Sequence, residues 1–238
     1  MEEIICRKEL RVSAALSLET VSAVDAAESY LSREIFRGTF KVGERIRESP
    51  LASELGISRH TLRAAFSRLE SVGLVTYREN RGWSVPVLDR TQYEDILLLR
   101  QSLESTAYGI VFERSIKPDK HVKDALQRIL DVTDAVSWPE RLEADCALHQ
   151  ALVDLAGSQR LSQAFACMMT EFRLCRLQSL DWLDQLGLDQ WKQRHVDLVE
   201  DMTRGDAAAL EDAMSHYVSN PWITRRRISA HTKAVADD

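Results

Sequence analysis

Four side chains in the second half of the sequence have the types and spacing of a metal site. Asp145 and His149 are four residues apart, so a helix would place the carboxylate and the imidazole on one face. His195 and His216 stand on either side of a predicted turn, and two antiparallel helices joined there would bring both imidazoles to a similar height. One carboxylate and three imidazoles suit a divalent ion, with zinc and nickel the leading candidates. Taken alone the pattern is weak, because a histidine on a helix is more often a surface or hydrogen-bonded core residue.

A second group of side chains has the chemistry of DNA contact. Arg59 and Arg63 are four residues apart, on one face of a predicted helix that Ser58 caps. The amino terminus of such a helix presents free N–H groups to phosphate, and an arginine can bridge guanine O6 and N7 with its forked guanidinium group. The simpler interpretation is a solvated basic face. Two features argue against it: the helix follows a turn, and a hairpin that carries an arginine follows the helix.

These arginines lie in a basic segment of an acidic chain. The 238 residues carry 31 Lys and Arg against 37 Asp and Glu, a formal net charge of -6. Residues 30–90 alone carry 11 basic against 7 acidic side chains, a local charge of +4, which leaves -10 on the remainder. The net charge therefore does not exclude nucleic acid as a partner, because it averages a basic part with an acidic one.

Apolar periodicity and turn residues divide the basic segment into short elements. Helices are predicted over 26–37, 50–55 and 59–72. Ser49 is the expected N-cap of the second helix and Pro50 its first residue. Two β-rich runs surround the turn-forming residues 79–82 and predict a hairpin. Three helices followed by a small hairpin make a winged helix-turn-helix.

The remainder of the chain is predicted to be helical. Glycines, prolines and N-capping residues separate six helices, at 91–115, 119–135, 138–156, 159–185, 189–204 and 206–227. Six helices with short connections indicate an antiparallel bundle. The expected fold class is therefore mainly α. A winged helix-turn-helix covers 25–88 and an antiparallel all-α helical bundle covers 89–230, after an N-terminal extension, 1–24, to which no function is assigned.

Composition also limits where the protein works. The first residues lack the basic start and the apolar run of a signal peptide, and no run reaches the roughly 18 apolar residues of a membrane span. The cysteines lack the spacing of a zinc finger and are too few for a disulfide scaffold of this size. They are Cys6, Cys146, Cys167 and Cys175. We therefore expect a cytoplasmic protein with reduced thiols and no membrane partner.

The basic segment resembles the DNA-binding domain of GntR-family bacterial transcription regulators. The resemblance is carried by the runs 43–48, 51–75 and 80–82, and it covers about sixty residues in a specific order. It implies that the helix starting after Ser58 enters the major groove and that the wing reaches the adjacent minor groove. Many members carry an arginine where this chain has Ser49, and Arg47 could supply its phosphate contact. The expected DNA contacts are Arg47, Ser58, Arg59, His60, Thr61, Arg63, Arg81 and Gly82.

The second half is similar to the FCD domain, the helical effector domain of the FadR subfamily of GntR regulators. Asp145, His149, His195 and His216 each match a position of its metal site, so the resemblance implies a bound metal ion. The family often places an arginine at the effector cavity, where this chain has Arg100. An ion pair of Arg100 with Glu104, one helical turn later, is an equally good and compatible interpretation. Members of the family commonly bind small carboxylates.

Together these patterns predict a bacterial transcription regulator, and a repressor in particular. Two copies would read the half-sites of an inverted repeat in double-stranded operator DNA. A small carboxylate in the metal-containing helical domain would alter the affinity for that operator. Two alternatives stay open: a regulator that senses its ligand without a metal, and a helical-bundle metalloenzyme. No base or nucleophile is tied to the predicted metal site by spacing, so we do not expect an enzyme.

Overall fold

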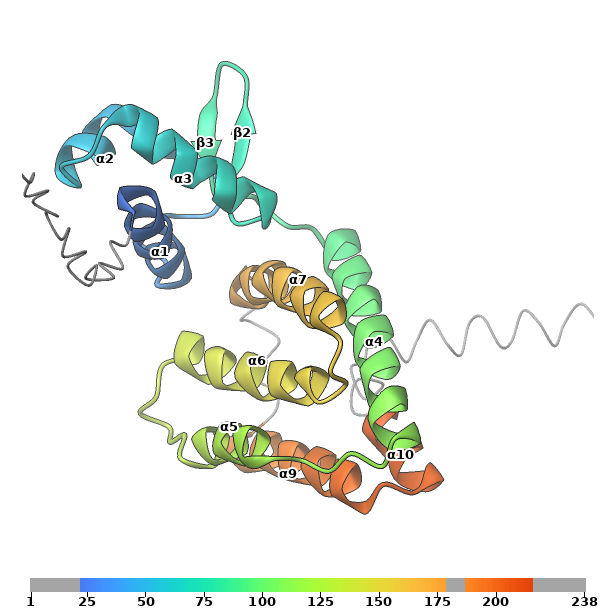
Figure 1. The fold of residues 1–238 in the computed structure, drawn as a ribbon. Coiled ribbons are helices and arrows are strands. Elements are labelled where there is room, and N and C mark those ends of the chain that lie inside the picture. The colour runs from blue at the N-terminus through green and yellow to red at the C-terminus, as the bar shows by residue number, and fades with distance from the viewer. Residues whose placement is uncertain (1–21, 179–186, 216–238) are drawn as a thin grey trace, which may run out of the picture.

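The computed structural model describes residues 22–178 and 187–215, which are mainly helical (Figure 1). The first part contains α1 (Ala23–Phe36), α2 (Glu48–Glu54) and α3 (Arg59–Ser71), with the strands β1 (Arg45–Ile46), β2 (Thr76–Arg78) and β3 (Gly82–Ser84). The strand order is β1-β3-β2, and both pairs are antiparallel. These elements confirm the predicted winged helix-turn-helix, in which β2 and β3 form the wing that projects from the molecule in Figure 1.

Capping residues explain where two of these helices begin. The Ser22 side chain accepts from the backbone N–H of Asp25, whose side chain accepts from the Ser22 N–H, so α1 begins three residues before the predicted start at 26. Ser58 accepts a hydrogen bond from the Thr61 N–H at 3.0 Å and caps α3 as predicted. The apolar stripe of α3 is buried in the core of this part, as its spacing predicts. Its members are Leu62, Ala65, Phe66 and Leu69.

The start of α2 differs from the prediction. The helix begins at Glu48, and its N-cap is Arg47 rather than Ser49, with no hydrogen bond from a capping side chain. Pro50 is therefore the third helical residue and not the first. It is tolerated there because the first four N–H groups of a helix have no partner within it. Glu48 also places a negative charge at the positive end of the helix dipole.

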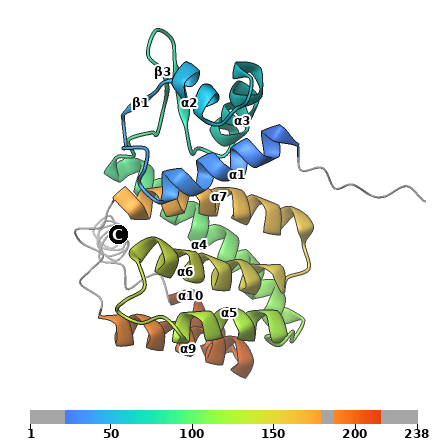
Figure 2. The ribbon, with the colours of Figure 1, turned by 90° about the vertical axis from the view of Figure 1, so that its left-hand side faces the viewer.

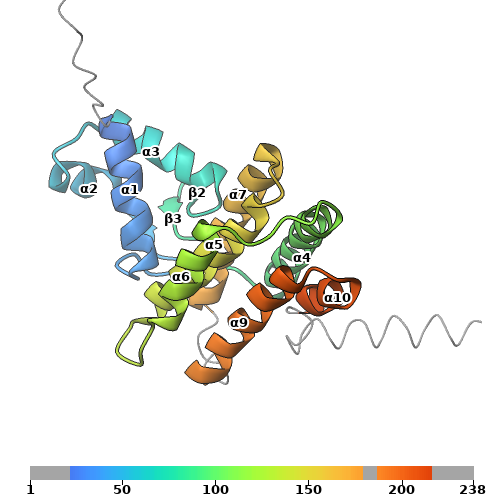
Figure 3. The same cartoon turned by 60° about the horizontal axis from the view of Figure 1, so that its bottom comes forward.

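The second part is a bundle, as predicted. Its helices are α4 (Arg90–Glu113), α5 (Lys120–Leu130), α6 (Trp138–Asp154), α7 (Gln159–Gln178), α9 (Leu188–Arg204) and α10 (Ala207–Ser215). In Figure 2, α7, α6 and α5 lie in successive layers beneath the winged helix, with α4 behind them. Figure 3 shows α10 between the ends of α9 and α4, and it packs against both. Within the described ranges no helix is long and apolar enough to cross a membrane.

One helix of the bundle ends earlier than predicted, and two predicted helix ends lie outside the described residues. The α5 helix ends at Leu130, before the predicted 135, because the chain then turns around the side chain of Arg141, which donates to the carbonyl groups of Thr133, Asp134 and Val136. The predicted helices 159–185 and 206–227 both run past the last residue described for them, 178 for α7 and 215 for α10.

Each part has its own hydrophobic core, and α7 contributes to both. Phe172 and Cys175 are buried in the core of the bundle. Leu174, on the same helix, is buried in the core of the winged helix. The guanidinium carbon of Arg173 lies 4.0 Å from the ring centre of Phe36 at the end of α1. Figure 2 shows α1 lying along α7, which is the surface where these contacts form.

The segment between the two parts is also attached to α7. The side-chain amide of Gln178 donates to the carbonyl group of Pro86 and accepts from the N–H of Leu88, each at 3.0 Å. The winged helix is therefore held to the bundle by α7 as well as by the chain that leads into α4.

Candidate metal centre and DNA interface

Three of the four predicted metal ligands converge inside the bundle. Asp145 and His149 lie one turn apart on α6, and His195 lies on α9. One ligand atom from each lies within 4.8 Å of the other two. Both imidazoles are buried, and Asp145 is partly buried. The fourth predicted ligand, His216, lies outside the described residues.

His195 is engaged at both ring nitrogens. Its Nδ1 lies 2.7 Å from the carbonyl oxygen of Trp191, one turn earlier in α9, and a carbonyl oxygen only accepts. Nδ1 therefore carries a hydrogen. Nε2 faces Asp145 Oδ1 at 2.9 Å. Two lone pairs would repel each other at this distance, so a positive charge belongs here: either a second proton on Nε2 or a metal ion that both residues bind.

The imidazole of His149 also has an oxygen at its Nδ1, supplied by a side chain of α4. Its Nδ1 lies 3.1 Å from Oε1 of Glu104, which is fully buried. Burial and the nearby Arg100 guanidinium lower the pKa of His149, so its imidazole is neutral near pH 7. The neutral imidazole is the form that binds metal ions.

The Asp145 carboxyl group is ionised despite its surroundings. Burial opposes ionisation, but the hydrogen bond with His195 and the positive groups around the carboxyl group outweigh it and hold the pKa of Asp145 well below its usual range. The neighbouring thiol behaves differently, since burial and the adjacent Asp145 charge raise the pKa of Cys146 to about 12. The site therefore offers a carboxylate as a ligand and no thiolate from Cys146.

Arg100 lies beside the three ligands. The side chain is 4% exposed and stacks on Phe172, with 4.3 Å from its guanidinium carbon to the ring centre. Its Nε lies 3.3 Å from Glu104 Oε1, and its Nη2 lies 3.8 Å from Asp145 Oδ2. The ion pair with Glu104 expected from the sequence is therefore present, and it leaves the guanidinium group next to the ligand cluster.

The donor set fits a divalent ion. One carboxylate oxygen and two imidazole nitrogens are common ligands of zinc and nickel, and three protein ligands leave positions open for a small molecule. Both imidazoles donate from Nδ1 to an oxygen, which is the outer contact that metal-binding histidines usually make. An anionic ligand on the ion would meet the guanidinium group of Arg100 nearby.

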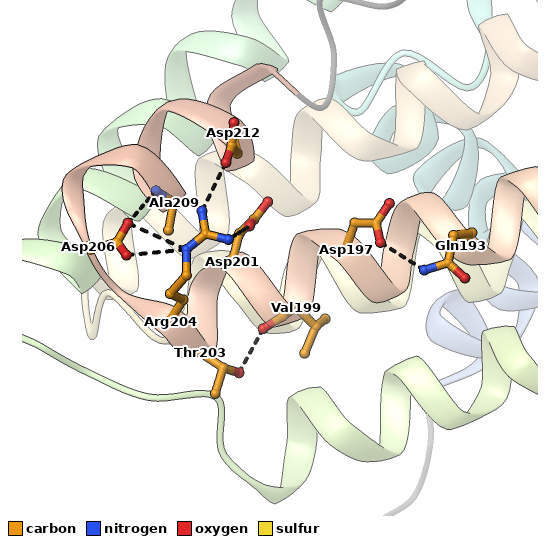
Figure 4. A network of polar contacts seen from close by, with 9 residues as sticks. All are labelled: Gln193, Asp197, Val199, Asp201, Thr203, Arg204, Asp206, Ala209 and Asp212. Carbon is orange, nitrogen blue, oxygen red and sulfur yellow. Dashed lines mark hydrogen bonds and ion pairs between the residues drawn. The ribbon is translucent and has the colours of Figure 1, made fainter.

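The turn that joins α9 to α10 is fixed by a network around Arg204 (Figure 4). Its guanidinium group pairs with Asp201 at 3.0 Å, Asp206 at 3.3 Å and Asp212 at 2.9 Å. Lys117 donates to the last carbonyl groups of α9. These contacts set the angle between the helix of the third ligand and α10.

The predicted DNA contacts gather on the surface of the winged helix. Arg59, His60 and Arg63 are exposed on α3, and Thr61 is half-buried. Ser58 is exposed at the cap of the same helix. The other three are Arg47 before α2, Arg81 at the tip of the wing and Gly82 in β3.

An acidic residue of α2 faces Arg59 and Arg63 of α3. Glu48 Oε2 lies 2.7 Å from Nε of Arg63 and 3.7 Å from Nη2 of Arg59, and Glu48 Oε1 accepts from Nη2 of Arg63 at 3.2 Å. The hydrogen bond from Arg63 is the main reason that the pKa of Glu48 is lowered. The α2 helix thus orients the side chains that α3 would present to DNA.

The wing is shaped by its turn and anchored by an aromatic pair. Asn80 and Gly82 have φ of 63° and 76°, the left-handed conformation that a tight hairpin turn needs. Trp83 stacks on Phe66 of α3 with ring centres 5.1 Å apart. Beside the wing lies an open depression of about 460 Å³ whose lining includes Arg45, Arg78 and Arg81. A basic depression at this place suits a phosphate backbone.

Sequence reasoning missed two carboxylates. Glu48 and Arg63 are 15 residues apart and lie on different helices, so no local spacing could signal the pair. Glu104 was expected to pair with Arg100, but its contact with His149 depends on how α4 packs against α6.

Comparisons with known proteins agree with this architecture. Residues 23–85 match the family model of the bacterial regulatory proteins of the gntR family, and residues 95–220 match that of the FCD domain. The HTH-type transcriptional regulator YdhC of Bacillus subtilis is 26% identical over 193 residues, which cover 79% of this chain and 84% of YdhC. The probable D-xylose utilization operon transcriptional repressor of Paenarthrobacter nicotinovorans is 23% identical, with 85% of this chain and 88% of the repressor covered.

Two solved structures share the fold. A GntR transcriptional regulator from Rhodococcus sp. RHA1 superposes with a TM-score of 0.67 at 24% identity, covering 84% of this chain and 99% of that one. Escherichia coli McbR superposes with a TM-score of 0.63 at 17% identity, covering 90% of this chain and 99% of that one.

Proposed function

The chain belongs to the gntR family of bacterial regulatory proteins and carries an FCD domain, and from this premise we propose a repressor whose operator affinity is set by a small carboxylate bound beside a divalent metal ion. Members of this family are transcriptional regulators that bind DNA. The observation that carries the finer proposal is the convergence of Asp145, His149 and His195 beside the buried Arg100. A metal ion there would supply positive charge, and the arginine a second point of attachment for an anion.

The DNA-binding half of the proposal rests on the surface of α3 and the wing. Arg59 and Arg63 are exposed next to the capped amino terminus of α3, where N–H groups and side chains can face phosphates and base edges. Arg81 extends the basic surface onto the wing. We propose that two copies of the chain act together, so that their winged helices read the two half-sites of an inverted repeat.

Repression is proposed from the named relatives. The xylose operon protein of Paenarthrobacter nicotinovorans and GlaR of Escherichia coli are both named as transcriptional repressors. A ligand can act as a switch only if it binds the DNA-competent and incompetent arrangements with different affinity. A coupling of about 1–3 kcal/mol would change operator affinity by about 5–150-fold.

The first experiment measures binding to DNA. The purified protein is titrated by fluorescence anisotropy against duplexes from the region upstream of its own gene, at a fixed salt concentration. The Arg59→Ala and Arg63→Ala variants should each bind about 5–150-fold more weakly, since each removes a direct contact worth about 1–3 kcal/mol. Arg160→Ala, at an exposed arginine of the bundle, is the matched control and should bind like the parent. Equal binding by all four proteins would refute the assigned interface.

The second experiment measures the metal. Elemental analysis of the purified protein, before and after dialysis against a chelator, should give one divalent ion per chain in the parent. Replacing His149 and His195 together by alanine should abolish metal binding. The same titration with DNA, repeated with a panel of small dicarboxylates and hydroxy acids, should show a shift in affinity that needs both the metal and Arg100.

One alternative has an observation in its favour. His195 lies 2.9 Å from Asp145, and His149 lies 3.1 Å from Glu104, and neither pair needs an ion to form. A regulator that senses its ligand through these pairs alone would contain no stoichiometric metal, and its response to carboxylates would survive chelation. The elemental analysis separates the two candidates.

A further inference from the structure

Glu104 is an unusual residue for the centre of a helical bundle. Its side chain is 0% exposed, on α4, where an apolar residue would avoid the cost of burying a charge. Its polar contacts with the other described residues use one oxygen: Oε1 lies 3.1 Å from Nδ1 of His149 and 3.3 Å from Nε of Arg100. Among the described residues, Oε2 has no hydrogen-bond partner. A buried carboxylate with half of its acceptors unused is hard to explain as a stabilising residue.

The contact with His149 determines which ring nitrogen carries the hydrogen. A neutral imidazole has one N–H and one lone pair, and Oε1 of Glu104, which already accepts from Nε of Arg100, faces Nδ1 as an acceptor. The hydrogen therefore lies on Nδ1, toward Glu104, and the lone pair lies on Nε2. A metal ion needs that lone pair.

The tautomer of the second imidazole, His195, is also determined by an acceptor at Nδ1, but this acceptor is a backbone carbonyl group. His195 donates from Nδ1 to the carbonyl group of Trp191 in its own helix, so the backbone fixes its tautomer. His149 depends on a side chain from another helix. Of the two histidines, only His149 can lose its acceptor through a side-chain substitution.

The contact with Arg100 gives Glu104 a second effect at the same site. It holds the guanidinium group against Phe172, with Nη2 3.8 Å from Asp145 Oδ2. One carboxylate oxygen thus orients both a proposed metal ligand and the proposed anchor of the anion.

We propose that Glu104 is a positioning residue that fixes the Nδ1–H tautomer of His149 and the direction of Arg100, and so prepares the cluster to take a divalent ion together with an anionic ligand. This inference rests on the proposed metal site. Glu104 itself does not bind the ion; it acts through the two side chains that it orients.

The test compares two variants with a matched control. Glu104→Leu fills the same space without an acceptor, and Glu104→Gln keeps an amide oxygen that can accept from His149. Glu113→Gln, at an exposed glutamate near the end of the same helix, is the control. The tautomer is read in the metal-free full-length protein from long-range ¹H–¹⁵N correlations of the imidazole rings, assigned with a His149→Gln variant. Affinity for Zn²⁺ and Ni²⁺ is measured by competition with a chromophoric chelator.

The parent should show His149 protonated at Nδ1. Glu104→Leu should move the hydrogen wholly or partly to Nε2 and weaken metal binding by about 10–100-fold, the usual effect of losing an outer-shell partner. Glu104→Gln should keep the parental tautomer and recover most of the affinity. If Glu104→Leu does not fold, the tautomer of the parent and the behaviour of Glu104→Gln still decide the matter.

The outcomes separate this inference from the proposed function. A parent with His149 protonated at Nε2, or a folded Glu104→Leu variant with parental tautomer and metal affinity, would overturn the role of Glu104. A parent that shows the expected tautomer and binds neither ion would refute the metal in the proposed function, while the orientation of His149 by Glu104 would stand.

Discussion

At the scale of single residues, opposing influences act on the ionisation of Asp145 in its cluster with His149 and His195. Burial acts against the charge of Asp145, and the surrounding positive groups restore it. The result is a carboxylate that is ionised in a place where few carboxylates are, next to imidazoles that are already oriented. A cation could enter such a site without any prior rearrangement of these side chains.

If Asp145 is a ligand of the proposed metal ion, removing its charge should abolish metal binding. Asp145→Asn keeps the size of the side chain but leaves a neutral amide opposite Nε2 of His195. We expect the metal content measured by elemental analysis to fall from one ion per chain to near zero, with the far-ultraviolet circular dichroism unchanged. Asp124→Asn, at an exposed residue of α5 that pairs only within its own helix, is the control. Full occupancy in Asp145→Asn would show that this carboxylate is not a ligand.

The other decisive carboxylate is Glu48, which should set how selectively the protein binds DNA. It neutralises part of the charge on Arg59 and Arg63 and fixes the direction of Arg63. Glu48→Gln should raise affinity for non-specific duplexes severalfold, because phosphates meet more positive charge, and lower the ratio of specific to non-specific affinity. Anisotropy titrations with an operator duplex and a scrambled duplex measure both quantities. A ratio that stays the same or rises would contradict this role.

The same residue gives a prediction about pH. The pKa of Glu48 is lowered from 4.5 in the folded protein, chiefly by the hydrogen bond from Arg63, so its pairing stabilises the fold at all pH values above 4.5. This contribution is lost as the pH falls below 4.5 through the folded-state pKa. The difference in unfolding free energy between the parent and Glu48→Gln should therefore be constant from pH 7 to pH 5.5 and shrink below pH 4.5. A difference that grows on acidification would have the wrong sign.

At the scale of elements, most of the fold could be predicted, because helices and turns carry local signals. Ser58 marks the start of α3, and Gly205, with φ of 72°, marks the end of α9. The start of α2 was mispredicted because the first turn accommodates Pro50 at its third position as well as at its first. In the candidate site, Asp145 and His149 followed from their spacing along one helix, whereas His195 followed from the predicted pairing of two helices and from the family resemblance. The roles of Glu48 and Glu104 did not, because both depend on contacts between helices.

The clearest case of a role set by packing is α7. From its sequence it is one more bundle helix, but Leu174 is buried in the core of the winged helix. Leu174→Ala should lower the free energy of unfolding by about 2–5 kcal/mol, as loss of a buried leucine usually does. Hydrogen exchange should show the loss of protection concentrated in α1 and α3 as well as in α7.

Leu130→Ala, at a leucine of α5 that is 36% exposed, is the control for this change and should cost far less. If exchange in α1 and α3 were the same in Leu174→Ala and the parent, the two parts would not share a core in solution.

At the scale of the whole molecule, charge is divided between the parts. The winged helix is basic, and the acidic residues that give the chain its net charge of -6 lie mostly elsewhere. Attraction to phosphate should therefore be local and sensitive to salt. The slope of log affinity against log salt measures the number of phosphates neutralised, at about -0.9 for each.

Arg81→Ala should reduce the magnitude of this slope by about one if the wing arginine contacts a phosphate. Arg160→Ala, on the bundle, should leave the slope unchanged. The measurement is a series of anisotropy titrations between 50 and about 200 mM salt, the range in which such slopes are resolved. Identical slopes for all three proteins would place the wing away from the DNA backbone.

The attachment of Gln178 to the segment before α4 bears on how such regulators can diverge. Within the part of the chain that the structure describes, the side-chain amide of Gln178 makes its hydrogen bonds to main-chain groups, the carbonyl group of Pro86 and the N–H of Leu88. These two hydrogen bonds therefore do not depend on which side chains the connecting segment carries, provided that position 88 does not become proline, which has no N–H. The constraint falls instead on a single glutamine, 90 residues after Leu88 and 92 after Pro86 along the chain. A comparison of related sequences would then show a variable connector beside a constant glutamine, and a hybrid protein assembled from two relatives would need to inherit that glutamine with its new bundle.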